Sequence, residues 1–283
     1  MNKLVPVGRT FFALALIGLG VDHFIFGAFV MGRAPAWPTS LPGGLAWAYL
    51  TGMVFVGSGL ALLTGKQARS AAILVGILVF LWALLRHLPV VATSPLFSGA
   101  WTNAGKALRF IGGILAVAAT FPKVAPGRST PLLRFMNHEG GFILVGQICL
   151  GLTLILNGTQ HFIFVEFVAS LIPAWFPGDA VFWTYFGGVA LIAGGLGLLI
   201  PQTARWAALL SGLMVFSWFW IVHLSREIAG VADGIAVFEA LATAGSLFVI
   251  AGFLHHRERT PASGEAPSQT TAALRTDALD GGG

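Results

Sequence analysis

Residues 146–175 read GQICLGLTLILNGTQHFIFVEFVASLIPAW and repeat residues 8–37, GRTFFALALIGLGVDHFIFGAFVMGRAPAW, at an offset of 138 without a gap. Fourteen of these thirty positions are identical, including the His-Phe-Ile-Phe run and the Pro-Ala-Trp end. After a two-residue deletion, residues 47–88 align with 183–224, with eighteen of forty-two positions identical. The chain is therefore predicted to contain two copies of one structural unit.

The composition of the chain excludes an ordinary water-soluble domain. Hydrophobic residues make up 56% of the 283 residues, charged residues only 10%, and the mean hydropathy is +0.84. A soluble domain has about a quarter charged residues. The net charge of +5 does not indicate nucleic-acid binding, because the basic residues lie mostly between apolar runs and do not cluster on one helix. The sequence predicts an integral membrane protein in contact with the lipid bilayer.

Eight apolar stretches can each cross a bilayer, which requires about 20 helical residues. They are residues 10–31, 45–64, 70–91, 105–122, 141–165, 181–200, 206–225 and 235–254. Each copy holds an even number of spans, so both copies keep the same orientation in the membrane. The predicted fold is all-α and polytopic, with eight transmembrane helices arranged as two parallel-repeat four-helix bundles.

The domain boundaries follow from these spans. We predict a first four-helix unit at 1–122 and a cytoplasmic linker at 123–140. A second four-helix unit at 141–256 and a disordered cytoplasmic tail at 257–283 follow. With a cytoplasmic N-terminus, eleven of the sixteen Lys and Arg residues fall on the cytoplasmic side. Both termini are therefore predicted to be cytoplasmic.

Two histidines in each copy are the main candidates for a ligand or cofactor site. His23 and His87 lie on the first and third spans, and His161 and His223 occupy the aligned positions of the second copy. With a rise of about 1.5 Å per residue, the two members of each pair reach comparable depths in the outer half of the bilayer. They can ligate haem b, hydrogen-bond a quinone or relay protons. Alternatively, they hold helices together by interhelical hydrogen bonds.

Five further polar residues lie in or near the spans and can support such a site: Asp22, Arg86, Lys106, Arg109 and Glu239. Asp22 precedes His23 and can orient its imidazole or pair with Arg86. The three cations can form a patch for an anionic group, or extend toward lipid headgroups. Glu239 can relay protons or pair with a neighbouring helix. The sequence contains no Cys-x-x-Cys pair or metalloprotease motif, and no metal site is predicted.

The second copy contains the run HFIFVEFVASLIPAWFPGDAVFWTYFGGVALIAGGLGLLIPQTARWAALL. Its histidine-aromatic start, Ile-Pro-Ala-Trp-Phe-Pro segment, glycine-rich span and Leu-Leu-Ile-Pro end resemble the DoxX-like family of bacterial membrane proteins. The resemblance covers nearly all of 141–225 and, more weakly, 8–90. The family's unit has four transmembrane helices, and its members include a subunit of a thiosulfate:quinone oxidoreductase. The resemblance implies a tandem DoxX-like protein in a redox-linked setting, located in a bacterial cytoplasmic (inner) membrane, but it assigns no catalytic residue.

Two functions of different classes follow. The first is a redox-linked membrane protein, or a membrane subunit of an oxidoreductase complex with soluble or membrane partner subunits. It contacts quinone or haem at the outer leaflet through the paired histidines. The second is a non-enzymatic structural, lipid-contacting or transport-assisting bundle in which the histidines only pack. The sequence does not decide whether the protein is an enzyme.

Overall fold

The computed structural model describes residues 1, 3–30, 37–38, 41–96, 98–123, 131, 134, 137–231 and 234–259. Every regular element across these residues is helical, which confirms the predicted all-α class. The Pro-Ala part of the first Pro-Ala-Trp loop, most of the predicted linker and nearly all of the predicted tail lie outside the described residues.

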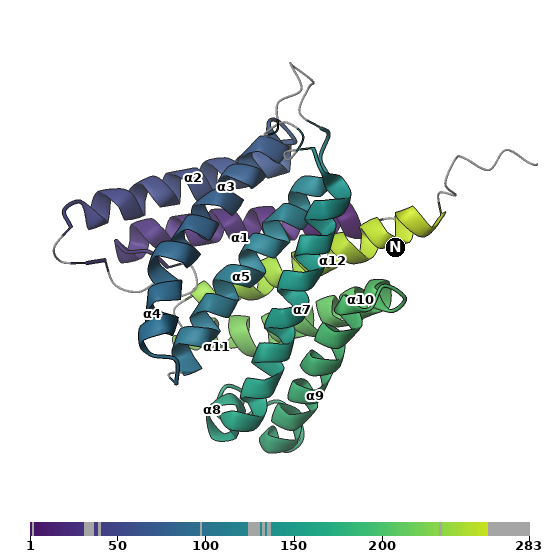
Figure 1. The fold of residues 1–283 in the computed structure, drawn as a ribbon. Helices are drawn as coiled ribbons and strands as arrows, with labels where there is room; N and C mark the ends of the chain where they lie inside the picture. The colour runs from purple at the N-terminus through teal and green to yellow at the C-terminus, as the bar shows by residue number, and fades with distance from the viewer. Residues whose placement is uncertain are drawn as a thin grey trace, which may run out of the picture.

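The chain forms a series of long, apolar helices with shorter helical segments between some of them (Figure 1). The first half contains α1 (Leu4–Phe26), α2 (Gly44–Thr64), α3 (Ala68–Trp82), the π-helical η2 (Ala83–His87), α4 (Leu88–Thr93) and α5 (Ser98–Ala119). The second half contains α7 (Glu139–Ile163), α8 (Val165–Ser170), α9 (Ala180–Leu199), α10 (Ala204–Trp218), the π-helical η3 (Phe219–Leu224), α11 (Ser225–Ile228) and α12 (Ile235–Arg259).

Seven helices of the described chain are long and apolar enough to cross a membrane. They are Leu4–Phe26, Gly44–Thr64, Ala68–Thr93, Glu139–Ile163, Ala180–Leu199, Ala204–Ile228 and Ile235–Glu258. Two of them run through a π-helical turn, so α3, η2 and α4 form one continuous helix, as do α10, η3 and α11. Helix α5, which overlaps the predicted span at 105–122, is not among the seven. It carries Lys106 and Arg109, which lower its hydropathy.

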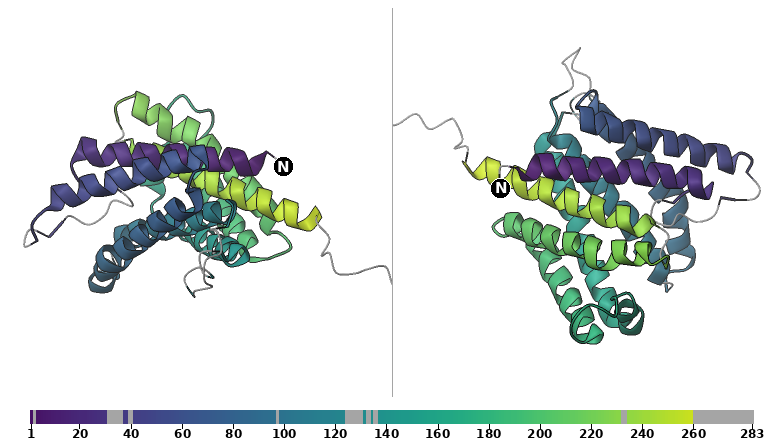
Figure 2. Two further views of the ribbon diagram at one scale, coloured as in Figure 1. Left: turned by 90° about the horizontal axis from the view of Figure 1, so that it is seen from above. Right: turned by 180° about the vertical axis from the view of Figure 1, so that it is seen from behind.

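The helices form two layers of four. One layer has the order α2, α1, α12, α10 and the other the order α3, α5, α7, α9, and the layers meet where α2 contacts α3, α5 contacts α12 and α9 contacts α10 (Figure 2). Helix α1 packs mainly along α2 and α12, whereas it barely touches α5 of its own half. Helix α7 likewise packs along α9 and along α5 of the other half. The two halves are therefore joined through the first helix of each.

Glycines allow the closest of these helix contacts. A Cβ atom on Gly20 would lie 2.9 Å from the carbonyl oxygen of Gly52, so α1 and α2 touch through their backbones. The aligned residues Gly158 and Gly188 make the same contact between α7 and α9, where the corresponding distance is 2.7 Å. Small residues at such crossings let helices approach closely in a membrane, where packing replaces the hydrophobic effect as the driving force.

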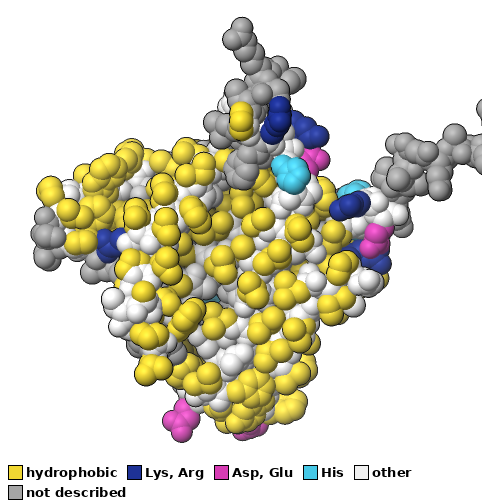
Figure 3. Space-filling view, in the orientation of Figure 1, with side chains coloured by type: hydrophobic (Ala, Val, Ile, Leu, Met, Phe, Trp, Pro, Cys, Tyr) yellow, Lys and Arg dark blue, Asp and Glu magenta, His cyan; other side chains and the backbone are white. Residues whose placement is uncertain are grey.

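The interior and the surface are both apolar, as expected for a protein surrounded by lipid. Helix α12 is the central element, since 83% of its most apolar window is buried, against at most 44% for the other six helices. Figure 3 shows hydrophobic side chains over most of one face, with most charged side chains at its edges. Near the start of α1, Val5 packs against Gly252 near the end of α12. The chain thus starts and finishes its helical part at the same end of the molecule.

Candidate functional site

The third long helix of each half widens into a π-helix at aligned positions. Residues Ala83–His87 form η2 and residues Phe219–Leu224 form η3, and the aligned His87 and His223 lie within these turns. A π-helical turn inside an α-helix accommodates an extra residue, and such turns are frequent at functional sites. Both halves therefore present one histidine from a locally widened helix.

The first long helix of each half contributes the second histidine in a defined tautomer. Nδ1 of His23 lies 2.7 Å from the carbonyl oxygen of Leu19, and Nδ1 of His161 lies 2.8 Å from that of Asn157. A carbonyl oxygen only accepts hydrogen bonds, so Nδ1 carries the hydrogen and donates it. Nε2 of the neutral ring is then an acceptor. Each half thus offers an acceptor nitrogen fixed by its own helix.

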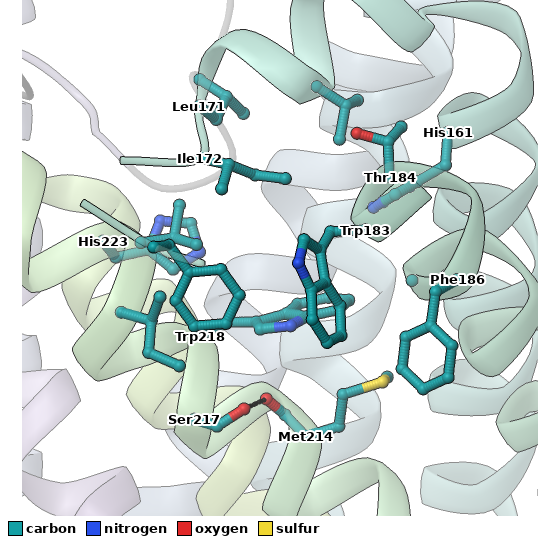
Figure 4. A pocket seen from close by; sticks show the side chains of 15 residues that line it. His161, Leu171, Ile172, Trp183, Thr184, Phe186, Met214, Ser217, Trp218 and His223 are labelled. Atoms are coloured by element: carbon teal, nitrogen blue, oxygen red, sulfur yellow. Dashed lines mark hydrogen bonds between the residues drawn. The ribbon is translucent and has the colours of Figure 1, made fainter. Parts of the chain in front are cut away.

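In the second half, His161 and His223 line one cavity of about 310 Å³ (Figure 4). The view shows the two histidines on opposite sides of the cavity, with the indoles of Trp183 and Trp218 between them. The complete lining is His161, Val168, Leu171, Ile172, Phe176, Trp183, Thr184, Phe186, Gly187, Met214, Ser217, Trp218, Ile221, Val222 and His223. The wall is mostly apolar, with a few polar groups, as in small-molecule sites.

Local contacts hold the walls of this cavity. The imidazole of His161 stacks on the indole of Trp218, with ring centroids 6.0 Å apart and an interplanar angle of 25°. The carboxylate of Asp179 accepts a hydrogen bond from the backbone N–H of Phe182 at 2.7 Å and caps the start of α9. Trp183 donates its indole N–H to the carbonyl oxygen of Pro177 at 2.8 Å. The loop before α9 is therefore tied to the helix that lines the cavity.

In the first half, His23 and His87 also line one cavity, but its volume is only about 10 Å³. Its lining is His23, Phe29, Thr51, Phe55, Val79, Trp82, His87 and Ala107. The ring centroid of Phe29 lies 4.1 Å from that of Trp82. The structure thus brings together the two histidines of each half, but it leaves open space between them only in the second half.

A charged cluster lies between the halves. Lys106 Nζ on α5 is 2.7 Å from a carboxylate oxygen of Glu239 on α12, and Arg109 is 3.9 Å from the same oxygen. His223 interacts electrostatically with this cluster. Glu239 is buried, so two helices of different halves are joined by an ion pair in the interior. Two of the three cations proposed for an anion-binding patch are thus paired with Glu239.

The remaining supporting residues lie apart from this cluster. The guanidinium of Arg86 lies over the indoles of Trp37 and Trp82, 5.7 and 5.8 Å from the ring centroids. Asp22 is buried on α1. Its aligned residue Gln160 donates a hydrogen bond to Thr102 of α5 at 2.7 Å. Within the described ranges, no group of three or more His, Cys, Asp or Glu side chains has the arrangement of a metal site.

Sequence reasoning selected the four histidines but missed the residues that shape the cavity. The aligned residues Trp82 and Trp218 could have indicated such a wall. An indole near each histidine pair supplies both a flat face and an N–H donor. The replacement of Thr51 by Gly187 at aligned positions was a second signal, since the loss of a side chain creates space.

Comparison with known proteins gives a partial family match. Residues 150–241 match the model of a family described as Domain of unknown function (DUF8561). The matched segment covers less than half of the chain and includes His161, His223 and Glu239. No curated protein and no solved structure matches the chain.

Proposed function

We propose that this chain is a redox-linked multi-pass membrane protein that binds the headgroup of a quinol, the reduced form of a quinone, in the cavity of its second half. The observation that carries the proposal is the cavity of about 310 Å³ with His161 and His223 in its wall. The DoxX-like resemblance supports a membrane redox setting and, by analogy only, partner subunits that exchange electrons with the bound molecule.

The size of the cavity favours a single substituted ring. Its volume is about twice that of the ~150 Å³ engineered cavity that binds benzene, and it lies at the lower end of the range of about 300–1,000 Å³ for small-molecule sites. A porphyrin with its four pyrrole rings is too large for this space. The volume therefore favours a single substituted ring over haem b between His161 and His223.

The polar groups favour a hydroxyl-bearing ring. Because His161 donates through Nδ1 to Asn157, its Nε2 accepts a hydrogen bond, and the hydroxyl of a quinol supplies the donor. Phe186 lines the cavity and is 54% exposed, so one wall of the cavity is formed by a side chain at the molecular surface. An apolar tail on the ring can leave the site toward the bilayer at this point.

The proposed membrane arrangement has eight spans, with α5 as the eighth. At about 1.5 Å per residue, its 22 residues extend about 33 Å, enough to cross the hydrocarbon core. Pairing of Lys106 and Arg109 with Glu239 removes the main obstacle, because these charges lie inside the protein. The common end of α1 and α12 supports an even number of crossings. The internal alignment supports a parallel repeat, and the distribution of Lys and Arg supports both termini in the cytoplasm. The DoxX-like resemblance supports a bacterial inner membrane.

The test is quinone retention by the protein purified in mild detergent. Organic extraction and chromatography of the wild type are expected to give close to one quinone per chain. His161→Leu removes the acceptor nitrogen and is expected to lose the quinone, whereas the matched first-half variant His23→Leu retains it. A visible spectrum of oxidised and dithionite-reduced protein checks the exclusion of haem. Haem bands that disappear in His161→Leu would overturn the argument from size.

A non-enzymatic bundle is the second candidate, and the hydrogen bonds of His23 and His161 to their own helices favour it. In that case the imidazoles only complete helix packing. Absence of extractable quinone, together with no binding of added decylubiquinol, would support this candidate and refute the proposed site.

A further inference from the structure

Aligned residues line the two histidine cavities, but the first cavity is nearly filled and the second is open. His23, Trp82 and His87 in the first half align with His161, Trp218 and His223 in the second, and each set lines its own cavity. The volumes are about 10 and 310 Å³. The wall is therefore present in both halves, and the difference lies in what occupies the space.

The first cavity is occupied by a ring of the protein itself. Phe29 lies against Trp82 at 4.1 Å, stacks on Trp37 at 5.6 Å and meets His23 edge-on at 6.2 Å between ring centroids. The guanidinium of Arg86 lies over both indoles. One six-membered ring thus occupies the space beside the histidine and the tryptophan.

Two polar atoms of the first cavity wall remain without hydrogen bonds within the described part of the chain. Nε2 of His23 and Nε1 of Trp82 are both buried and have no hydrogen-bond partner there. One is an acceptor and the other a donor. Buried polar groups are usually satisfied, since leaving one unpaired costs about 1–3 kcal/mol. Phe29 fills the space but cannot bond to either atom, so the wall has the polar groups of a ligand site and an apolar occupant.

One residue difference explains why the second cavity is open. Gly27 ends α1 with φ of 58°, which turns the chain so that Phe29 returns over the cavity. The aligned residue is Val165, and a β-branched residue strongly disfavours this left-handed conformation. The chain continues instead into α8, which carries the aligned Phe167 outward, where it is 65% exposed.

A second difference enlarges the open cavity further. Thr51 of the first cavity wall is replaced by Gly187. A Cβ atom on Gly187 would lie 3.3 Å from the Trp218 ring and 3.5 Å from the His161 ring. The missing side chain therefore leaves space beside both rings.

We propose that the first half is a closed copy of the ligand site, in which Phe29 takes the place that the ligand ring has in the second half. The inference rests on the proposed function and specifies it. The protein binds one ligand, not two, and that ligand has a single planar ring that packs against Trp218, as Phe29 packs against Trp82. A hydroxyl group of the ligand donates its O–H to Nε2 of His161, and a ligand oxygen accepts from the Nε1–H of Trp218, as the hydroxyl groups of a quinol or phenol can.

Decylubiquinol binding to the purified full-length protein tests this inference. Equilibrium dialysis is expected to give one site per chain for the wild type. Gly187→Thr, which restores the first-half residue, is expected to weaken binding by about tenfold or more, as for a misplaced methyl group or two in an apolar pocket. Gly187→Ala is expected to weaken binding less. Gly57→Ala is the matched control, because a Cβ atom at Gly57 meets nothing within 4 Å.

Variants that open the first cavity provide a second test. Phe29→Ala is expected to add a second site that is weaker than the first, because Thr51 remains in its wall. Phe29→Ala with Gly187→Thr is expected to leave two weak sites, one of which is lost in His23→Leu. No binding to the wild type would refute the proposed function itself. A single site whose affinity is unchanged by Gly187→Thr, or two sites in the wild type, would refute this inference but not the proposed function. If Phe29→Ala does not fold, the Gly187 series still decides where the ring binds.

Discussion

Lys106 Nζ lies 2.7 Å from the Glu239 carboxylate, and this ion pair joins α5 of the first half to α12 of the second. The side chains are 20% and 7% exposed, so the pair lies largely inside the protein. The two residues occupy roughly corresponding places in the last long helix of each half. This contact between the two halves depends on opposite charges at corresponding places, Lys106 in the first copy and Glu239 in the second. The difference lies in the helix where the two copies have diverged most.

Glu239→Gln is expected to destabilise the protein strongly. The substitution leaves Lys106 and Arg109 without their carboxylate, and breaking a buried ion pair typically costs about 3–5 kcal/mol. Thermal unfolding in detergent, followed by loss of the monodisperse chromatographic peak, measures the effect. Arg205→Gln is the control, because Arg205 pairs with the more exposed Glu258 at the end of α12, where an ion pair contributes about 0–1 kcal/mol. Equal losses in both variants would contradict a special role for the interior pair.

Gly52→Ala is expected to separate α1 from α2. A Cβ atom there would lie 2.9 Å from the carbonyl oxygen of Gly20 and 3.1 Å from Cβ of His23, and overpacking typically costs about 1–3 kcal/mol. Gly57→Ala on the same helix meets open space and is expected to be neutral or slightly stabilising, because alanine favours helix. Comparison of the two unfolding temperatures checks the prediction, and a matching drop for Gly57→Ala would refute the packing explanation.

Gly27→Ala is expected to lower stability by about 1–2 kcal/mol, because the left-handed conformation at the end of α1 is costly for a residue with Cβ. It should also loosen Phe29 and admit decylubiquinol to the first cavity. Thermal unfolding and equilibrium dialysis measure the two effects. Gly140→Ala, at a helical position with open space around it, is the control. Unchanged stability in Gly27→Ala would show that this turn does not hold Phe29 in place.

Reporter fusions test the proposed topology. A green fluorescent protein fused to the C-terminus is expected to fluoresce, because that end is proposed to be cytoplasmic. Alkaline phosphatase fused after Pro95, between α4 and α5, is expected to be active on the outer side. The same enzyme fused after Gly65, between α2 and α3, is expected to be inactive. Activity after Gly65 and none after Pro95 would reverse the orientation, and equal activity at both would contradict the single span Ala68–Thr93 between them.

Helix positions followed from the sequence where glycines or composition mark the ends. The span predicted at 45–64 matches α2 (Gly44–Thr64), which is flanked by Gly43 and Gly65 with φ of 81° and 73°. The apolar run predicts the first span at 10–31, but α1 runs from Leu4 to Phe26. That shift arose because the apolar run continues beyond the turn at Gly27. Hydropathy follows burial in lipid and does not detect a change of backbone conformation within an apolar run.

The sequence by itself determined that the chain forms apolar membrane-length helices, because a chain with only 10% charged residues is too apolar to fold as a soluble domain. Its internal alignment also selected four histidines in two matching pairs. Only the tertiary structure decided that Lys106 meets Glu239 and that one histidine pair faces open space while the other faces Phe29. The reason is physical: cavities and ion pairs depend on distances between helices. Those distances are set by side chains and turns far apart in the chain, such as Gly27 against Val165 and Thr51 against Gly187.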